Sequence, residues 1–112
     1  MHKFQFRSPR YQVNLPVKLS FDDAILHGRC REISQEGMCL ELQDCPGANN
    51  CGTASFHYET VSVEVGVCVA RTGRCSGGMR FVFQTEGQRR EIARLVAMVA
   101  ARGGQSRPFL VE

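Results

Sequence analysis

Hydrophobic and polar residues alternate along two long stretches of the chain. Residues 11–20 (YQVNLPVKLS) place an apolar side chain at every odd position, and residues 61–70 (VSVEVGVCVA) place a valine at each odd position. A period of two is typical of a strand with one buried face, so we predict a strand in each stretch. Pro16 cannot donate a hydrogen bond to a neighbouring strand, which predicts an edge position or a bulge.

Shorter runs of similar character predict four more strands. They cover residues 25–33, 38–42, 54–59 and 79–83. Gly28 is a candidate bulge within the first of these runs. Turns are predicted at the acidic pair 22–23, at residues 34–37 (SQEG) and at residues 71–78. Residues 43–53 form the longest stretch without a pattern, and they contain proline, glycine and asparagine.

The period changes after residue 85. Apolar residues then recur at the i, i+3, i+4, i+7 spacing of an amphipathic helix: Ile92, Leu95, Val96 and Val99. Thr85 and Gln88 form a capping-box pattern at the start, and Gly103 with Gly104 follows the end. We therefore predict a helix over residues 86–102.

These elements predict a mainly β fold. We expect a small six-stranded antiparallel barrel with the C-terminal helix packed over one opening, because closure removes exposed edges and buries the apolar face of the helix. The length of 112 residues fits one domain. We predict a flexible basic lead-in over residues 1–10, the folded unit over 11–102, and a tail over 103–112.

Charge is distributed unevenly. Residues 1–31 carry a net charge of +4, residues 32–66 carry −6 and residues 67–112 carry +5, within a total of +3. Twelve of the 14 basic residues are arginines. Arginine suits bidentate contacts with phosphate and guanine. The bias therefore favours a phosphorylated ligand or, equally, reflects a genome rich in GC codons.

The chain contains six cysteines, and no two form a CxxC pair. They are Cys30, Cys39, Cys45, Cys51, Cys68 and Cys75. We interpret them as structural thiols, because free cysteine behaves as a small buried hydrophobe. The alternative is a metal or redox site at Cys45 and Cys51, which bracket a loop near His57. The spacing lacks the usual four zinc ligands, so we expect no metal.

No catalytic pattern is present. The sequence lacks a nucleophile elbow, a GxGxxG segment and a Walker loop, and its three histidines are isolated. We therefore expect no enzymatic activity. An RNA-binding barrel would need exposed aromatic platforms, and the chain has no tryptophan and only two tyrosines. We expect neither DNA nor RNA as a partner.

Two segments contain side chains suited to a ligand. In FRSPRY, Arg7 and Arg10 precede the first predicted strand and could clamp an anion, although solvated basic tails are common. In EISQEG (residues 32–37), Glu32 offers a carboxylate and Ser34 a hydroxyl. Gly37 allows a tight backbone or a positive φ. The alternative for this second segment is an ordinary hairpin turn.

In this order, the two segments resemble the PilZ domain family over roughly residues 5–102. The family pattern has Arg-x-x-x-Arg before the first strand and Asp/Asn-x-Ser-x-x-Gly between strands two and three. The stretches VSVEVGVCVAR and GGMRFVF and the closing helix also match. Phe6 occupies the position of the first arginine here, and Glu32 replaces the Asp or Asn.

The resemblance implies a bacterial receptor for cyclic di-GMP. Arg7 and Arg10 would hold phosphates and stack on guanine. Glu32 would bind a guanine edge, Ser34 would contact phosphate and Gly37 would permit the approach. A protein partner would receive the signal. The alternative is a degenerate PilZ domain that binds no nucleotide and acts as an adaptor, for example in type IV pilus assembly or motility.

Further expectations concern cofactors and location. We expect no cofactor, since cyclic di-GMP would be a ligand. No apolar stretch approaches the length of a membrane span, and no signal peptide is evident, so we predict a cytoplasmic protein that does not insert into membranes. We expect a monomer or a weak dimer.

Overall fold

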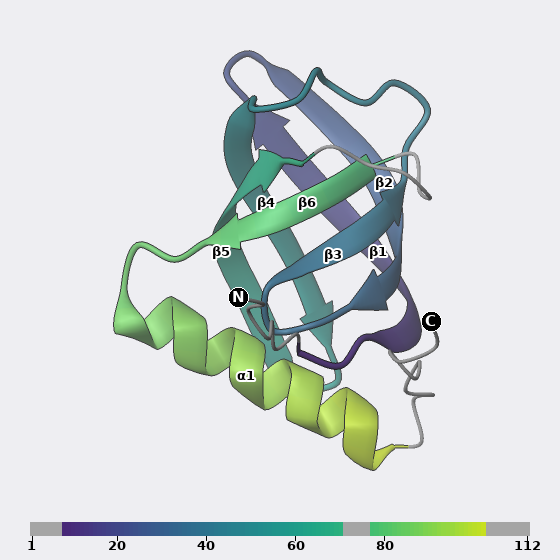
Figure 1. Cartoon of the computed structure of the whole chain (residues 1–112), viewed down its shortest axis with the longest axis vertical. Helices are drawn as coiled ribbons and strands as arrows, with labels where there is room; N and C mark the ends of the chain where they lie inside the picture. The colour runs from purple at the N-terminus through teal and green to yellow at the C-terminus, as the bar shows by residue number, and fades with distance from the viewer. Residues whose placement is uncertain (1–7, 71–76, 103–112) are drawn as a thin grey trace, which may run out of the picture.

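The computed structural model describes residues 8–70 and 77–102, and within them six antiparallel strands close into a barrel beside one helix (Figure 1). The elements are β1 (Tyr11–Phe21), β2 (Ala24–Ile33), β3 (Gly37–Glu41), β4 (Cys51–Tyr58), β5 (Val61–Val69), β6 (Gly77–Val82) and α1 (Glu86–Ala101). Around the barrel the strand order is β1-β2-β3-β6-β5-β4. The predicted mainly β fold is confirmed.

The alternating pattern determines which side chains fill the barrel. The odd positions of β1 from Leu15 onward are buried, and so are all five odd-numbered valines of β5. Leu19 of β1, Leu40 of β3 and Val65 of β5 are completely buried. Side chains from separate strands thus meet in one continuous core, as the period of two predicts.

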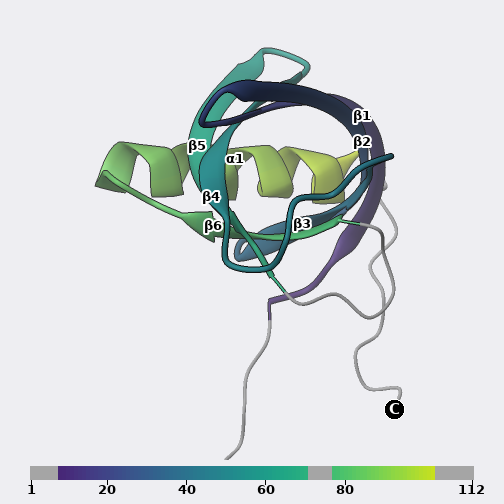
Figure 2. The same ribbon diagram turned by 90° about the horizontal axis from the view of Figure 1, so that it is seen from above.

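Helix α1 crosses one opening of the barrel (Figures 1 and 2). Its buried residues are the four that the sequence pattern predicts: Ile92, Leu95, Val96 and Val99. Thr85 caps the start, because its hydroxyl accepts the Gln88 N–H at 3.1 Å. Gly103 and Gly104 lie outside the described residues, as do residues 1–7 of the predicted lead-in and the predicted tail. Within the described part, no helix is long and apolar enough to span a membrane.

Pro16 lies at an open edge, as predicted. β4 pairs with β1 only through Lys18, Leu19 and Ser20, so Pro16 stands outside that ladder. Here the missing N–H of proline removes no bond to β4.

The predicted bulge at Gly28 is wrong. Gly28 pairs in register with Val17, and the irregularities lie instead between Gln12 and Leu15 in β1 and after Cys30 in β2. A Cβ atom at Gly28 would overlap the Glu41 carbonyl oxygen as well as the Leu42 side chain. Glycine is therefore needed at position 28 for space rather than for backbone irregularity.

The interpretation of all the cysteines as structural thiols is also wrong. Cys51 and Cys68 form a disulfide between β4 and β5, with their Cα atoms 4.0 Å apart. The pattern placed Cys51 in a loop, whereas β4 begins there and the register sets Cys51 opposite Cys68. The alternative site at Cys45 and Cys51 is excluded by this bond, and no cluster of three or more potential metal ligands occurs among residues 8–70 and 77–102. Cys75 lies outside the described residues.

The closing helix provides a test of the fold. Leu95 is completely buried, so Leu95→Ala should reduce the free energy of unfolding by about 2–5 kcal/mol through lost contacts and an unfilled cavity. Arg94→Ala, at the exposed neighbouring position, should change it by about 0.5 kcal/mol or less. Urea denaturation followed by circular dichroism measures both. Equal effects of the two substitutions would contradict this packing.

Candidate functional site

Arg10 and Glu32 come together at one end of the barrel. Arg10 immediately precedes β1, and Glu32, near the end of β2, pairs with Gln12. The Arg10 Nη1 atom lies 3.8 Å from the Glu32 Oε1 atom. The Arg10 side chain is 37% exposed and the Glu32 side chain 15%. The two residues form an ion pair whose arginine remains accessible.

Local irregularity accompanies this pair. The register of β1 against β2 shifts just after Gln12, and the register of β2 against β3 shifts just before Glu32. A bulge redirects neighbouring side chains, and bulges are common beside functional sites. The sequence gives no signal for either irregularity, because each depends on how two strands align.

Ser34 begins the tight turn between β2 and β3. Its hydroxyl oxygen accepts the backbone N–H of Glu36 at 3.1 Å and that of Gly37 at 3.2 Å. The Ser34 N–H donates to the Gly37 carbonyl at 2.9 Å. Ser34 is 8% exposed. The hairpin-turn alternative for this segment is therefore correct as a description of its geometry.

Gly37 is required by the packing of β6. Of the two expectations for position 37, a positive φ is not observed, and the tight backbone approach is confirmed. Gly37 pairs with Arg80, and a Cβ atom there would overlap the Met79 carbonyl oxygen. The Phe81 N–H also donates to the Glu36 carbonyl at 2.9 Å, which holds the turn against β6.

The structure thus brings two of the predicted residues into contact, and a third lies close to them in the sequence. Arg10 and Glu32 form the ion pair, and Ser34 follows Glu32 by two residues. Gly37 closes the same turn. Arg7 lies outside the described residues, so its part in the predicted clamp stays a prediction.

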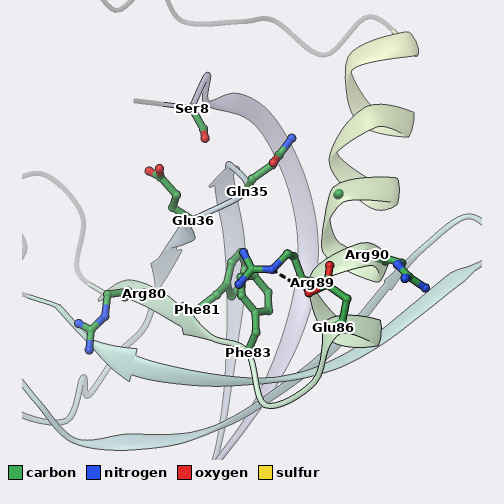
Figure 3. A pocket seen from close by; sticks show the side chains of 10 residues that line it. Ser8, Gln35, Glu36, Arg80, Phe81, Phe83, Glu86, Arg89 and Arg90 are labelled. Carbon is green, nitrogen blue, oxygen red and sulfur yellow. Dashed lines mark ion pairs between the residues drawn. The ribbon is translucent and has the colours of Figure 1, made fainter. Parts of the chain in front are cut away.

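A pocket of about 660 Å³ opens beside this turn (Figure 3). Glu36 of the turn, Ser8, and Phe83 after β6 line it together with Arg89 of α1. The Arg89 guanidinium carbon lies 4.8 Å from the centre of the Phe83 ring. Sequence reasoning missed this pocket. The capping box at Thr85 was the available signal. It begins a helix two residues after Phe83, so that side chains of the first helical turns can lie close to the Phe83 ring.

Cys30 precedes Glu32 by two residues in β2. Its side chain is buried, and its thiol donates to the Glu32 carbonyl at 3.2 Å. Burial raises the pKa of the Cys30 thiol to about 12. Burial also raises the pKa of Cys45, which is only half-buried. The Cys30 thiol is therefore protonated at neutral pH and is also shielded from reagents.

Comparison with known proteins gives consistent results. The model of the PilZ domain family matches residues 5–98. Among solved structures, eleven chains match. One is the crystal structure of the PilZ domain of CeSA from a cellulose synthesizing bacterium, with a TM-score of 0.69 and 15% sequence identity, covering 81% of this chain and 97% of that one. At this identity, the similarity supports the fold alone. No curated protein matches the chain.

The placement of Cys30 can be tested by alkylation. In the folded protein at pH 8.5, iodoacetamide should modify Cys45 well before Cys30, because the thiolate is the nucleophile and Cys30 is buried with a pKa of about 12. Mass spectrometry of a digest identifies the modified residues. Cys30 should react readily once urea unfolds the chain. Rapid modification of Cys30 in the folded protein would contradict its position in the core.

Proposed function

The chain belongs to the PilZ domain family of cyclic di-GMP receptors, and from this premise we propose that it binds cyclic di-GMP and passes the signal to a partner protein. The observation that carries the proposal is the contact between Arg10 and Glu32 beside the Ser34 turn. These residues come from separate segments and supply a cation, an anion and a hydroxyl at one end of the barrel. The protein would act as a receptor and not as an enzyme.

The Arg10–Glu32 pair can open for a ligand at small cost. Partly exposed ion pairs contribute about 0–1 kcal/mol to stability, and Arg10 is 37% exposed at a separation of 3.8 Å. A phosphate that accepts two hydrogen bonds from the guanidinium would replace this contact with a stronger one. Glu32 would then accept hydrogen bonds from the edge of a guanine.

The hydroxyl group of Ser34 makes only a long hydrogen bond as a donor. Its oxygen accepts two backbone hydrogen bonds at 3.1 and 3.2 Å, whereas the acceptor for its own O–H, the Gly37 carbonyl oxygen, lies 3.4 Å away. Hydroxyl donors normally lie about 2.5–3.0 Å from the acceptor. The proton can therefore turn toward a phosphate oxygen while both backbone bonds that hold the turn remain.

Arg7 would complete the site. It stands three residues before Arg10 in the lead-in. We propose that both arginines close over the docked nucleotide and that this closure changes the surface presented to the partner. Such a step would connect ligand binding to partner choice.

We also propose a cytoplasmic location. Disulfides are rare in that compartment, because cellular reductants keep thiols reduced. In the cell, those reductants would act on the Cys51–Cys68 disulfide. The eight residue pairs between β4 and β5 would still hold these strands together.

A second candidate function is that of an adaptor without nucleotide. Glu32 is paired with Arg10, and the Ser34 oxygen is engaged in the turn, so both groups already have partners within the fold. Phe6 occupies the position of the family's first arginine. These observations favour a domain in which the motif stabilises the turn and the surface binds another protein.

Calorimetric titration tests the receptor function. Cyclic di-GMP should bind with micromolar or tighter affinity, and GTP and cyclic AMP should not bind. Arg10→Ala should weaken binding by about tenfold to a hundredfold through loss of charged hydrogen bonds. Arg29→Ala is the matched control, since Arg29 is exposed and bonds to Asn14. Unchanged affinity in a folded Arg10→Ala protein would overturn the assignment of the site.

The adaptor function gives a different expectation. If the wild type binds no cyclic di-GMP, the double substitution Phe6→Arg with Glu32→Asp should create binding, because it restores both family residues on the same scaffold. The same calorimetric titration measures it. Absence of binding in both proteins would show that the scaffold itself no longer accepts the nucleotide.

A further inference from the structure

We propose that the pocket beside the Ser34 turn is a docking site for an acidic segment of a partner protein, with one aromatic side chain inserted into the pocket. The identity of this partner as the receiver of the signal rests on the proposed function. Docking itself requires no nucleotide, so the two ideas can fail separately.

The pocket has an aromatic floor. The Phe81 and Phe83 rings lie 5.9 Å apart between β6 and the first turns of α1 (Figure 3). Phe83 remains half-buried, so part of its ring is available. The volume of about 660 Å³ is ample for an aromatic side chain and a short stretch of backbone.

Three arginines also line the pocket: Arg80, Arg89 and Arg90. Arg80 and Arg90 lie on opposite sides of Phe83 (Figure 3), and neither forms an ion pair within the described residues. Arg89 stacks on Phe83 and lies 3.4 Å from Glu86, yet its side chain is 60% exposed. Exposed arginines beside aromatic rings are typical of residues that dominate binding at protein interfaces. Unpaired arginines favour a partner that supplies carboxylates.

The acidic residues of the rim favour a polypeptide over a small anion. Glu36 and Glu86 line the same pocket, and both would repel a phosphate that approached the three arginines. A polypeptide can place its carboxylates near Arg80 and Arg90 and its neutral backbone near the two glutamates. The charges of the pocket therefore favour a partner polypeptide whose carboxylates are spaced along its backbone.

The walls of the pocket connect it to the proposed nucleotide site. Glu36 donates its N–H to the Ser34 hydroxyl and also lines the pocket. Ser8, which lines the pocket as well, stands two residues before Arg10. A nucleotide held by Arg10 and Ser34 would thus touch two segments that shape the docking surface.

The test uses an immobilised peptide and the full chain without nucleotide. The probe is biotinylated Glu-Asp-Phe-Glu-Asp, and biolayer interferometry measures binding of the wild type and variants. Arg89→Ala should weaken binding about tenfold, as expected for an interface arginine. Arg94→Ala is the matched control, because Arg94 is exposed on the same helix but does not line the pocket. A peptide with glycine in place of phenylalanine should bind at least about tenfold more weakly.

Several results would overturn the proposal. These are no binding of the acidic peptide, equal binding by the Arg89→Ala and Arg94→Ala proteins, or equal binding of a lysine-rich peptide. Cyclic di-GMP calorimetry on the Arg89→Ala protein distinguishes failure of the docking proposal from failure of the proposed nucleotide binding. The nucleotide affinity of this variant should match that of the wild type.

Discussion

The close approach of β3 and β6 is the constraint on which the site depends. These strands are not consecutive, and their pairing joins the β1–β2–β3 segment to the β4–β5–β6 segment and closes the barrel. The approach requires glycine at position 37, where a side chain would overlap the Met79 carbonyl oxygen. It also fixes the Ser34 turn against β6, because the Phe81 N–H donates to the Glu36 carbonyl. Glu32 of the ion pair lies just before β3 in the sequence, and Phe83 of the pocket lies just after β6.

The fold could be predicted where the signal is local. Alternation with a period of two lies within one strand, so the buried faces of β1 and β5 follow from residues 11–20 and 61–70 alone. The capping box at Thr85 is equally local. The disulfide of Cys51 depends instead on the register of β4 against β5, and the pocket depends on three separate segments. Such features need the assembled barrel and could not be predicted from short patterns.

The positions of the candidate site could be predicted from the sequence, but the chemical roles of its residues could not. Ser34 and Gly37 have structural tasks that suffice to explain their presence, namely holding the turn and admitting β6. A sequence pattern cannot separate such a task from ligand binding, because one side chain can perform both. Arg10 differs in this respect, since its partly exposed ion pair contributes little to folding. The proposed ligand binding would therefore depend most directly on the arginine and on the hydroxyl of Ser34.

The most direct measurement of the central claim is a map of backbone amide shifts on adding cyclic di-GMP to isotope-labelled wild-type protein. We expect the largest shifts at Arg10, at Glu32 and through the Ser34–Gly37 turn. The hairpin at Asp22, which joins β1 to β2, should remain unchanged. Shifts centred on that hairpin, or no shifts at saturating nucleotide, would contradict the claim that Arg10, Glu32 and Ser34 form the nucleotide site.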